Sequence, residues 1–337
     1  MRKYLLPESG NFYKANLHCH STISDGRWTP EQLKENYMAH GYSIVAYTDH
    51  AVFVPHNDLA DDSFLPLNGY ELDISPEKIN SKSTKTCHIC FIATEKDRDI
   101  QRIFYDCKHL RNNLERVRLD PECEYLTREY STEAISKIMT QGAEDGFFVT
   151  YNHPAWSFET RDEYCNYNGM HAMEIVNYGC VTEGYDDRNS TIYSEMLRGG
   201  KKLYCIATDD NHNKYPVGHS LCDSFGGFTM IKAEKLEYKT VTDALLSGSF
   251  YASEGPAINS LYFEDGKIYI ETSEASRIVL ISDNRRYRVS CAEEAGAKIN
   301  SACFEITEAF GDYVRFEVAD ENGKCAYTNA YFLSELL

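Results

Sequence analysis

The sequence predicts an α/β fold: a TIM-like barrel of parallel strands and helices, followed by a small all-β domain. The first 210 residues or so alternate apolar, β-branched runs with helical patterns, which is typical of parallel strands joined by helical crossovers. After about residue 250 the pattern changes to short alternating segments separated by turn residues. At 337 residues, the chain is long enough for both parts.

Seven candidate strands in the first part are short apolar runs, many of them rich in β-branched or aromatic residues. They cover residues 13–18, 43–48, 64–71, 86–94, 146–152, 172–178 and 203–208. Seven such strands in one parallel sheet indicate a barrel.

Helices are expected between these strands. The first begins at TPEQ, where Thr29 is a good N-cap, Pro30 suits the first helical position and Gln32 completes a capping box. Gly41 ends this helix. The other expected helices cover residues 99–118, 132–144, 187–198 and 241–247.

The second part follows the segment FYASEGPAI, whose glycine and proline fit a turn between two domains. We expect residues 1–250 to form the barrel and residues 251–337 the all-β domain, whose default role is to cover the flank of the barrel. Its candidate strands cover residues 267–272, 277–282, 287–290 and 313–319.

Composition narrows the classes of function. The chain has 34 Lys and Arg against 52 Asp and Glu, a formal charge of -18, which argues against an extended nucleic-acid surface or an anionic membrane partner. The 12 cysteines are scattered without a disulfide framework, and no long apolar run occurs. We therefore expect a soluble cytoplasmic protein with free thiols; the oligomeric state stays open.

Six of the 11 histidines lie at or near the ends of predicted strands. Because the carboxyl ends of parallel strands open on one face of a barrel, these imidazoles are expected to converge there with nearby carboxylates. Such ligands, without a cysteine pattern of the zinc-ribbon kind, indicate a catalytic site for Zn, Mn or Fe. The residues concerned are His18, His20, His50, Glu71, His88, His153, Asp210 and His212.

The spacing of His18 and His20 supports this interpretation, because residues two apart in a strand point to the same face. Cys19 between them should point into the barrel wall as a small buried hydrophobe. Asp49 is expected to orient a neighbouring histidine.

These motifs, in their order, resemble the polymerase and histidinol phosphatase (PHP) superfamily of metal-dependent phosphoesterases, in its two-domain subgroup with a C-terminal β domain. The matching stretches are HCH with SDG, TDH, GYE, His88, NHP and DNH, and they span roughly residues 10–250. The resemblance implies a distorted (β/α)7 barrel, a small β-sandwich after it, and a hydrolase that carries two to three divalent ions.

The resemblance also implies which residues bind each ion. His18, His20, Glu71 and Asp210 would hold the first; Glu71, as a bridge, with His88 and His153 the second; Asp25, His50 and His212 the third. Asp25 stands where some members of the superfamily carry histidine, so occupancy of the third position is in doubt. Asp209 is an alternative to Asp210, but counting back two residues from His212 favours Asp210.

The expected reaction is hydrolysis of a small phosphomonoester, or of a nucleotide or oligonucleotide phosphate, by a metal-bridging hydroxide. Glu71 and Asp210 would act through the metals, and Arg27 or His219 would bind phosphate or help the leaving oxygen; each of the latter two also fits a solvated loop residue. Carboxylic or carbamate ester hydrolysis and a non-catalytic metal-bearing scaffold remain alternatives.

The substrate's alcohol group cannot be read from the sequence. The loops 51–63, 73–86 and 155–170 are expected to shape its pocket, and Lys214 is a weaker phosphate candidate. Trp156 and Tyr151 flank His153 and could stack a nucleobase, although core packing is the more common use of each.

Overall fold

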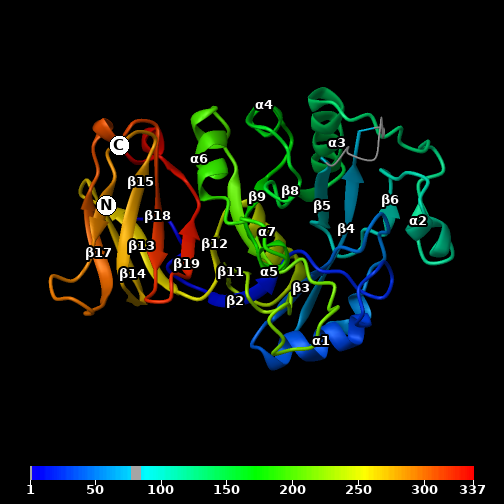
Figure 1. Ribbon diagram of the computed structural model, residues 1–337, viewed down its shortest axis with the longest axis horizontal. Coiled ribbons are helices and arrows are strands. Elements are labelled where there is room, and N and C mark those ends of the chain that lie inside the picture. Colours follow the sequence, from blue (N-terminus) through cyan, green and yellow to red (C-terminus); the bar gives the residue numbers. More distant parts are fainter. Residues whose placement is uncertain (1, 77–84) are drawn as a thin grey trace.

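The computed structural model describes residues 2–76 and 85–337 (Figure 1). A large mixed sheet runs through the whole molecule, and both ends of the chain lie beside the C-terminal β part. Among the described helices, none combines the length and the apolar composition needed to cross a membrane.

All seven strands expected in the first part are present, with ends shifted by at most a few residues. They are β2 (Asn11–Asn16), β3 (Ile44–Tyr47), β4 (Leu65–Ile74), β5 (Cys87–Ala93), β8 (Phe147–Tyr151), β9 (Ala172–Asn177) and β10 (Tyr204–Thr208). They pair in the order β10-β9-β8-β5-β4-β3-β2.

The expectation that all seven strands are parallel is wrong at β5. Strands β2, β3 and β4 are parallel, as are β8, β9 and β10, but β5 runs antiparallel to both β4 and β8. The amino end of β5 therefore lies at the same edge of the sheet as the carboxyl ends of its neighbours.

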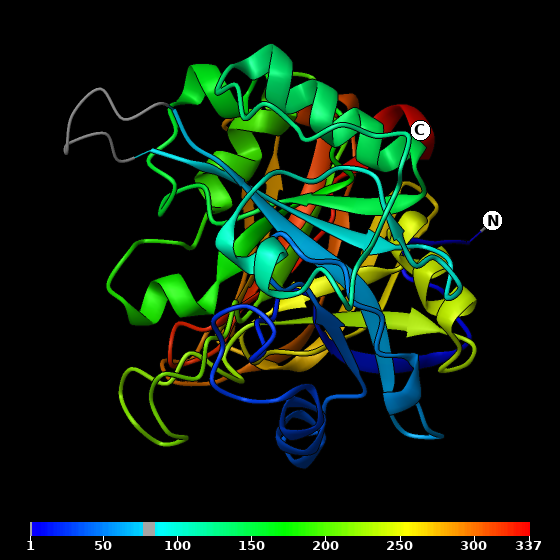
Figure 2. The ribbon, with the colours of Figure 1, turned by 90° about the vertical axis from the view of Figure 1, so that its right-hand side faces the viewer.

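The expected closed barrel is not confirmed, because within the described residues no strand pairs with the outer edge of β10. Side chains span this gap instead. Thr229 Oγ1 donates to the carbonyl of Ala207 (3.0 Å), and Asn329 Oδ1 accepts from the amide of Cys205 (3.0 Å). Side-chain hydrogen bonds thus hold the curled sheet together at its open seam. In the view turned by 90°, α3 lies above the strands and α1 below them (Figure 2).

At its other side the sheet continues beyond β2 into the C-terminal part. The path runs through β11 (Phe228–Ala233), β12 (Phe250–Ser253), β19 (Cys325–Thr328), β18 (Tyr313–Ala319), β15 (Arg277–Ser282) and β16 (Arg288–Ser290), and β20 (Tyr331–Phe332) pairs with β18. Residues 228–233 were not expected to form a strand, yet β11 is the link between β2 and the C-terminal strands.

A second sheet packs against these C-terminal strands. It consists of β1 (Lys3–Tyr4), β13 (Ile258–Glu264), β14 (Lys267–Ala275) and β17 (Ile299–Glu305). Ile268 and Ile270 of this sheet share one buried cluster with Leu280 and Phe316 of the large sheet. The amino-terminal residues thus belong to the C-terminal β part, as Figure 1 also shows.

Most expected helices are found. They are α1 (Pro30–Ala39), α3 (Thr132–Glu144), α6 (Ser190–Arg198) and α7 (Tyr238–Leu246). The capping box of Thr29 and Gln32 is formed as predicted. Shorter elements are η1 (Asn57–Leu59), α4 (Arg161–Tyr164), α5 (Tyr178–Thr182), η2 (Glu308–Phe310) and α8 (Leu333–Leu336).

The helix expected over residues 99–118 is wrong. This stretch contains β6 (Ile100–Gln101), α2 (Lys108–Asn112) and the start of β7 (Arg118–Leu119). Ile103, Phe104 and Tyr105 are buried in succession, which one face of a surface helix cannot provide because its neighbouring residues point about 100° apart.

Candidate metal centre

All nine predicted metal ligands come together at one edge of the large sheet. His18 and His20 follow β2, His50 follows β3, His153 follows β8, and Asp210 and His212 follow β10. Glu71 lies within β4, and His88 is near the start of β5, where the antiparallel direction brings it to the same edge. The ligand atoms fall into overlapping groups: His20, Asp25, His50 and His212; His18, Glu71 and Cys90; His18, His20 and Asp210; and Glu71, His88 and His153.

Glu71 is at the centre of the cluster. Its Oε1 lies 2.9 Å from His88 Nδ1, 3.2 Å from His18 Nε2 and 3.4 Å from His153 Nε2. Its Oε2 lies 2.9 Å from His50 Nδ1. One buried carboxylate therefore touches groups that belong to four different strands and can bridge neighbouring ions.

Asp210 completes the buried, inner part of the cluster, which also contains His18, His20 and Glu71. Its Oδ1 lies 3.0 Å from His20 Nε2 and 3.2 Å from His18 Nε2. Asp209 points away and accepts hydrogen bonds from the amides of Gly226 and Gly227, which separates the two aspartates as the sequence analysis favoured. Asp210 has a φ of 51°, a left-handed conformation that is uncommon for aspartate and is found at functional sites.

Asp25 forms the outer part of the cluster together with two histidines. Its Oδ1 lies 3.5 Å from His212 Nε2, 3.8 Å from His50 Nε2 and 4.0 Å from His20 Nδ1. Asp25 and His212 are partly open to solvent, whereas His20 is buried.

The donor set fits divalent ions. Two donors that each lie about 2.1 Å from a tetrahedral ion are about 3.4 Å apart, which is the spacing seen around Glu71 and Asp210. Within the described residues, three buried polar atoms of this cluster also lack a hydrogen-bond partner: His20 Nδ1, Glu71 Oε2 and Asp210 Oδ1. Buried polar atoms are normally satisfied, so these three atoms are suited to bind a cation.

The two inner carboxylates are held ionised. Burial opposes the charge of Glu71, but the surrounding imidazoles, His88 foremost, outweigh it and hold its pKa well below the usual range. Burial likewise opposes the charge of Asp210, and His18 and His20 lower its pKa strongly. Both residues are therefore anionic near neutral pH, as metal ligands must be.

The pKa values of the histidines in the cluster are shifted in different directions. Burial, reinforced by His50 and His212, lowers the pKa of His20 to about 4, so His20 is neutral near pH 7. For His50 and His153 burial is outweighed by contact with Glu71, and the pKa of each is raised to about 9. An ion must displace the protons that His50 and His153 carry in its absence.

Glu174 contacts two of the candidate ligands, His18 and His153, and was not predicted as a site residue from the sequence. Its Oε1 lies 2.7 Å from His18 Nδ1, and its Oε2 accepts a hydrogen bond from the amide of His153 (2.8 Å). A carboxylate in this place fixes which ring nitrogen of His18 faces the ion. The available signal was one acidic residue inside an otherwise mostly apolar strand, AMEIVN.

Asp49 does not orient a histidine, contrary to expectation. It accepts hydrogen bonds from the amides of Ser21 (2.8 Å) and Ser24 (3.0 Å) and from both hydroxyls, so it fixes the loop that carries Asp25. His109, which matched no motif, lies beside the cluster, with its ring centroid 5.8 Å from that of His50.

Two cysteines near the cluster are buried. Cys19 packs against Leu33 and Tyr37, in agreement with its expected position in the wall. Cys90 comes close to His18 and Glu71, and burial raises the pKa of its thiol to about 11. We therefore describe Cys90 as a neutral neighbour of the cluster rather than a thiolate ligand.

A cavity of about 690 Å³ opens over the cluster. Arg27 and Lys214 line it, and so does Trp156, whereas Tyr151 is buried and donates to Glu159. His219 is not brought to the cavity; its ring stacks on Tyr215 at 4.6 Å. Of the loop 73–86, residues 77–84 lie outside the described residues.

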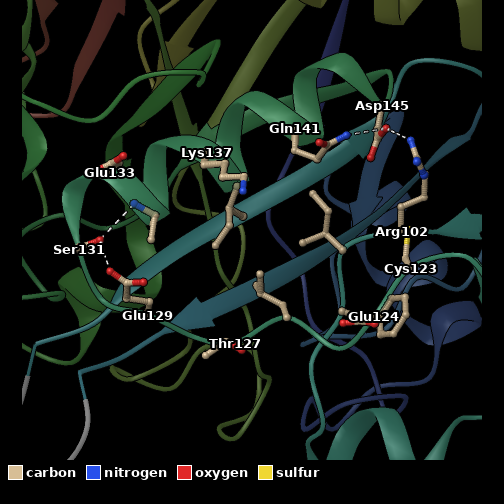
Figure 3. A pocket seen from close by; sticks show the side chains of 15 residues that line it. Arg102, Cys123, Glu124, Thr127, Glu129, Ser131, Glu133, Lys137, Gln141 and Asp145 are labelled. Atoms are coloured by element: carbon tan, nitrogen blue, oxygen red, sulfur yellow. Dashed lines mark hydrogen bonds and ion pairs between the residues drawn. The ribbon is translucent and has the colours of Figure 1, made fainter.

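A second cavity, of about 740 Å³, lies between α3 and residues 102–104 and 123–129 (Figure 3). Its polar side chains largely satisfy one another: Arg102 pairs with Asp145, and Ser131 caps α3. It has no convergent histidines, so the cavity over the cluster is the better candidate for chemistry.

No protein-family model and no curated protein matches this sequence. Among solved structures, similarity is found to a two-domain protein from Bacteroides vulgatus that contains a predicted PHP-like metal-dependent phosphoesterase, with 14% identity, coverage of 98% of this chain and 97% of that one, and a TM-score of 0.46.

Two further structures are similar over part of the chain. An amidohydrolase from Chromobacterium violaceum with bound sulfate and no metal has 18% identity over 61% of this chain and 90% of that one (TM-score 0.39). A protein from Bifidobacterium adolescentis, assigned as a metal-dependent phosphoesterase, has 15% identity over 65% and 94% (TM-score 0.37). At these scores, family and activity must be argued from the residues of this chain.

Proposed function

We propose that this protein is a metal-dependent hydrolase that cleaves phosphoric esters, either a small phosphomonoester or a terminal phosphate of a nucleotide or oligonucleotide. The observation that carries the proposal is the position of Glu71, which lies within 3.5 Å of five imidazoles at the bottom of an open cavity. A single buried carboxylate shared in this way is what a multinuclear site requires.

The proposed ligand sets are those predicted from the sequence, and the groups of neighbouring donor atoms support them, with His20 close to the third set as well as to the first. One ion would be held by His18, His20, Glu71 and Asp210, a second by Glu71, His88 and His153, and a third by Asp25, His50 and His212. Their order along the chain, which resembles the PHP superfamily, supports the same assignment. Imidazole and carboxylate donors suit Zn, Mn or Fe.

Charge favours an anionic substrate once ions are bound. The three carboxylates of the cluster carry about three negative charges, which two or three divalent ions, with about four to six positive charges, more than neutralise. Such ions neutralise phosphate oxygens and make hydroxide available near neutral pH. The pocket thereby becomes cationic in a chain whose formal charge is -18.

The remaining residues of the cavity supply binding and orientation. Arg27 and Lys214 line the cavity and can bind phosphate oxygens that point away from the ions. Glu174 keeps His18 in the tautomer that presents Nε2 to the first ion. We propose Arg27 as the group that stabilises charge on the leaving side, while His219 stays outside the cavity.

Metal analysis followed by a substrate screen tests the proposal. After growth with Mn, Fe and Zn, the purified protein should contain two to three transition-metal ions per chain. A chain that contains none would end the proposal. The screen compares p-nitrophenyl phosphate, nucleoside monophosphates, bisphosphonucleotides and short 5'-phosphorylated oligonucleotides with carboxylic and carbamate esters. Preferred turnover of the carbon esters would replace the phosphoesterase by an ester hydrolase on the same site.

A further inference from the structure

One side of the cavity over the metal centre is aromatic. The ring centroid of Trp156 lies 4.9 Å from that of His153 and 5.3 Å from that of His88, so the indole borders the proposed second ion site. Tyr185 follows at 6.4 Å from Trp156, and Phe158 at 6.0 Å from Tyr185. The three rings form a wall of edge-to-face contacts, with interplanar angles of 64° and 81°; Trp156 and Tyr185 line the cavity, and the exposed Phe158 lies beyond it.

Phe158 is the outermost ring of this wall, and its conformation is unusual. Its side chain is well exposed, at 58%, and its φ of 56° is in the left-handed region, which is a genuine outlier for a bulky residue. Exposure of the apolar ring to water and the left-handed backbone each raise the free energy of the folded protein. Strained residues of this kind are concentrated at ligand-binding segments.

The loop after β10 adds further apolar residues to the cavity. Tyr215 and Leu221 line it together with Lys214 and Asp223, and the side chain of Leu221 is exposed. The ring of Tyr215 stacks on that of His219, with an interplanar angle of 12°. Exposed apolar groups that gather around one opening mark a binding surface more often than scattered ones do.

The cavity therefore offers both charged and aromatic surface. The ligands, Arg27 and Lys214 supply positive and metal-binding groups, Glu183 and Asp223 add carboxylates, and Trp156 and Tyr185 supply aromatic surface. We infer that the alcohol part of the substrate carries a flat aromatic ring, which stacks on the wall formed by Trp156, Tyr185 and Phe158 while the phosphate faces the ions. This inference rests on the proposed function and adds the substrate class to it.

Two kinds of ester present such a ring. In an aryl or benzyl phosphate the ring is attached at or next to the ester oxygen, and in a nucleotide a sugar separates the base from the phosphate. The shared chemistry is stacking of a planar ring on aromatic side chains, which tolerates different rings because each has a π face. The substrates of the test distinguish the two sources.

The test compares kcat/KM for two matched pairs: benzyl phosphate with cyclohexylmethyl phosphate, and adenosine 5'-monophosphate with ribose 5-phosphate. Within each pair the leaving alcohol is similar and the aromatic ring differs. We expect the aromatic member of at least one pair to be preferred about fivefold or more. The preferred pair identifies the source of the ring.

The variant Tyr185→Leu should reduce this preference toward one, because it removes the middle ring of the wall without touching a proposed ligand. Tyr287→Leu is the matched control, since it makes the same substitution at a tyrosine outside the cavity, just before β16 in the C-terminal part. Turnover of both members of both pairs at equal kcat/KM would overturn the inference and leave the proposed function standing. Absence of turnover with every ester would instead overturn the proposed function.

A binding measurement decides the inference independently of turnover. The chain has two tryptophans, so in Trp28→Phe the indole fluorescence comes from Trp156 alone. Benzylphosphonate, which cannot be hydrolysed as an ester, should quench this fluorescence saturably, and cyclohexylmethylphosphonate should not. Equal effects of the two phosphonates, or none from either, would contradict stacking on this wall.

Discussion

The inner and outer parts of the ligand cluster differ in their access to water. The side chains of His20 and Glu71 in the inner part are 0% and 1% exposed, whereas those of Asp25 and His212 in the outer part are 44% and 35% exposed. Buried carboxylate support from Glu174 reaches only the inner part. In the proposed site, inner ions would therefore be held by fixed, dehydrated ligands, and an outer ion by ligands that already contact solvent.

The strongest test of this difference is Glu71→Gln. Glutamine keeps the volume of the side chain but removes the charge shared by the proposed ions, so we expect at least two ions per chain to be lost. Turnover should fall at least about 1,000-fold, because metal ions supply several kcal/mol of charge stabilisation. Metal content and kcat measure the two effects.

Glu159→Gln is the matched control for Glu71→Gln. Glu159 is also buried, but hydroxyl groups of Tyr151 and Tyr130 contact it instead of imidazoles, and burial raises its pKa to about 7. This variant should keep its metal and its turnover. If Glu71→Gln kept its ions as well, Glu71 would not be a bridging ligand.

A second prediction concerns pH. Because His50 and His153 have pKa values raised to about 9 in the absence of ions, both carry protons at pH 7, and metal binding must release these protons. Affinity should therefore rise with pH between 6 and 8, by about tenfold per pH unit for each proton released. Calorimetry in buffers with different ionisation enthalpies counts the protons, and binding without proton release would contradict the prediction that protonated His50 and His153 become ligands.

A third prediction concerns the contact between Glu174 and His18. Glu174→Gln removes the negative charge next to His18 Nδ1 while keeping hydrogen-bonding groups, so His18 is less firmly oriented. We expect metal affinity or kcat to fall about 10- to 100-fold, the usual effect of losing such a partner. Unchanged affinity and kcat would limit Glu174 to a packing role.

The positions of most candidate ligands were predictable from sequence because they follow a local pattern, an apolar run that ends in histidine or a carboxylate. The direction of β5 was not. The connection between Ile74 and Cys87 has about a dozen residues, a length that suits either a parallel crossover or a long hairpin. His88 was therefore assigned to the site through its motif, although its strand runs opposite to the expected direction.

Long-range pairing explains the other differences between expectation and structure. Strand β11 joins β2 to the C-terminal strands, and no local pattern reveals which strand it will pair with. Glu174 is recognisable as a site residue only once β9 is known to lie beside the histidines. Candidate ligands at strand ends can thus be recognised from the local sequence. Residues such as Glu174, which contact the ligands from a neighbouring strand, can be recognised only when the order of strands in the sheet is known.

The smallest expected effect is that of Asp25→Asn, which tests the outer part alone. Loss of one partly hydrated charge should weaken binding of the third ion and lower kcat/KM by about tenfold. The inner ions should stay bound, because Asp25 lies closest to His212, His50 and His20 Nδ1 and not to Glu71. Metal content should then fall from three ions to two per chain, while Asp62→Asn, at an exposed aspartate outside the cluster, should change neither quantity. Loss of all ions in Asp25→Asn would show that the two parts bind metal as one unit, and the difference in exposure would then have no consequence for affinity.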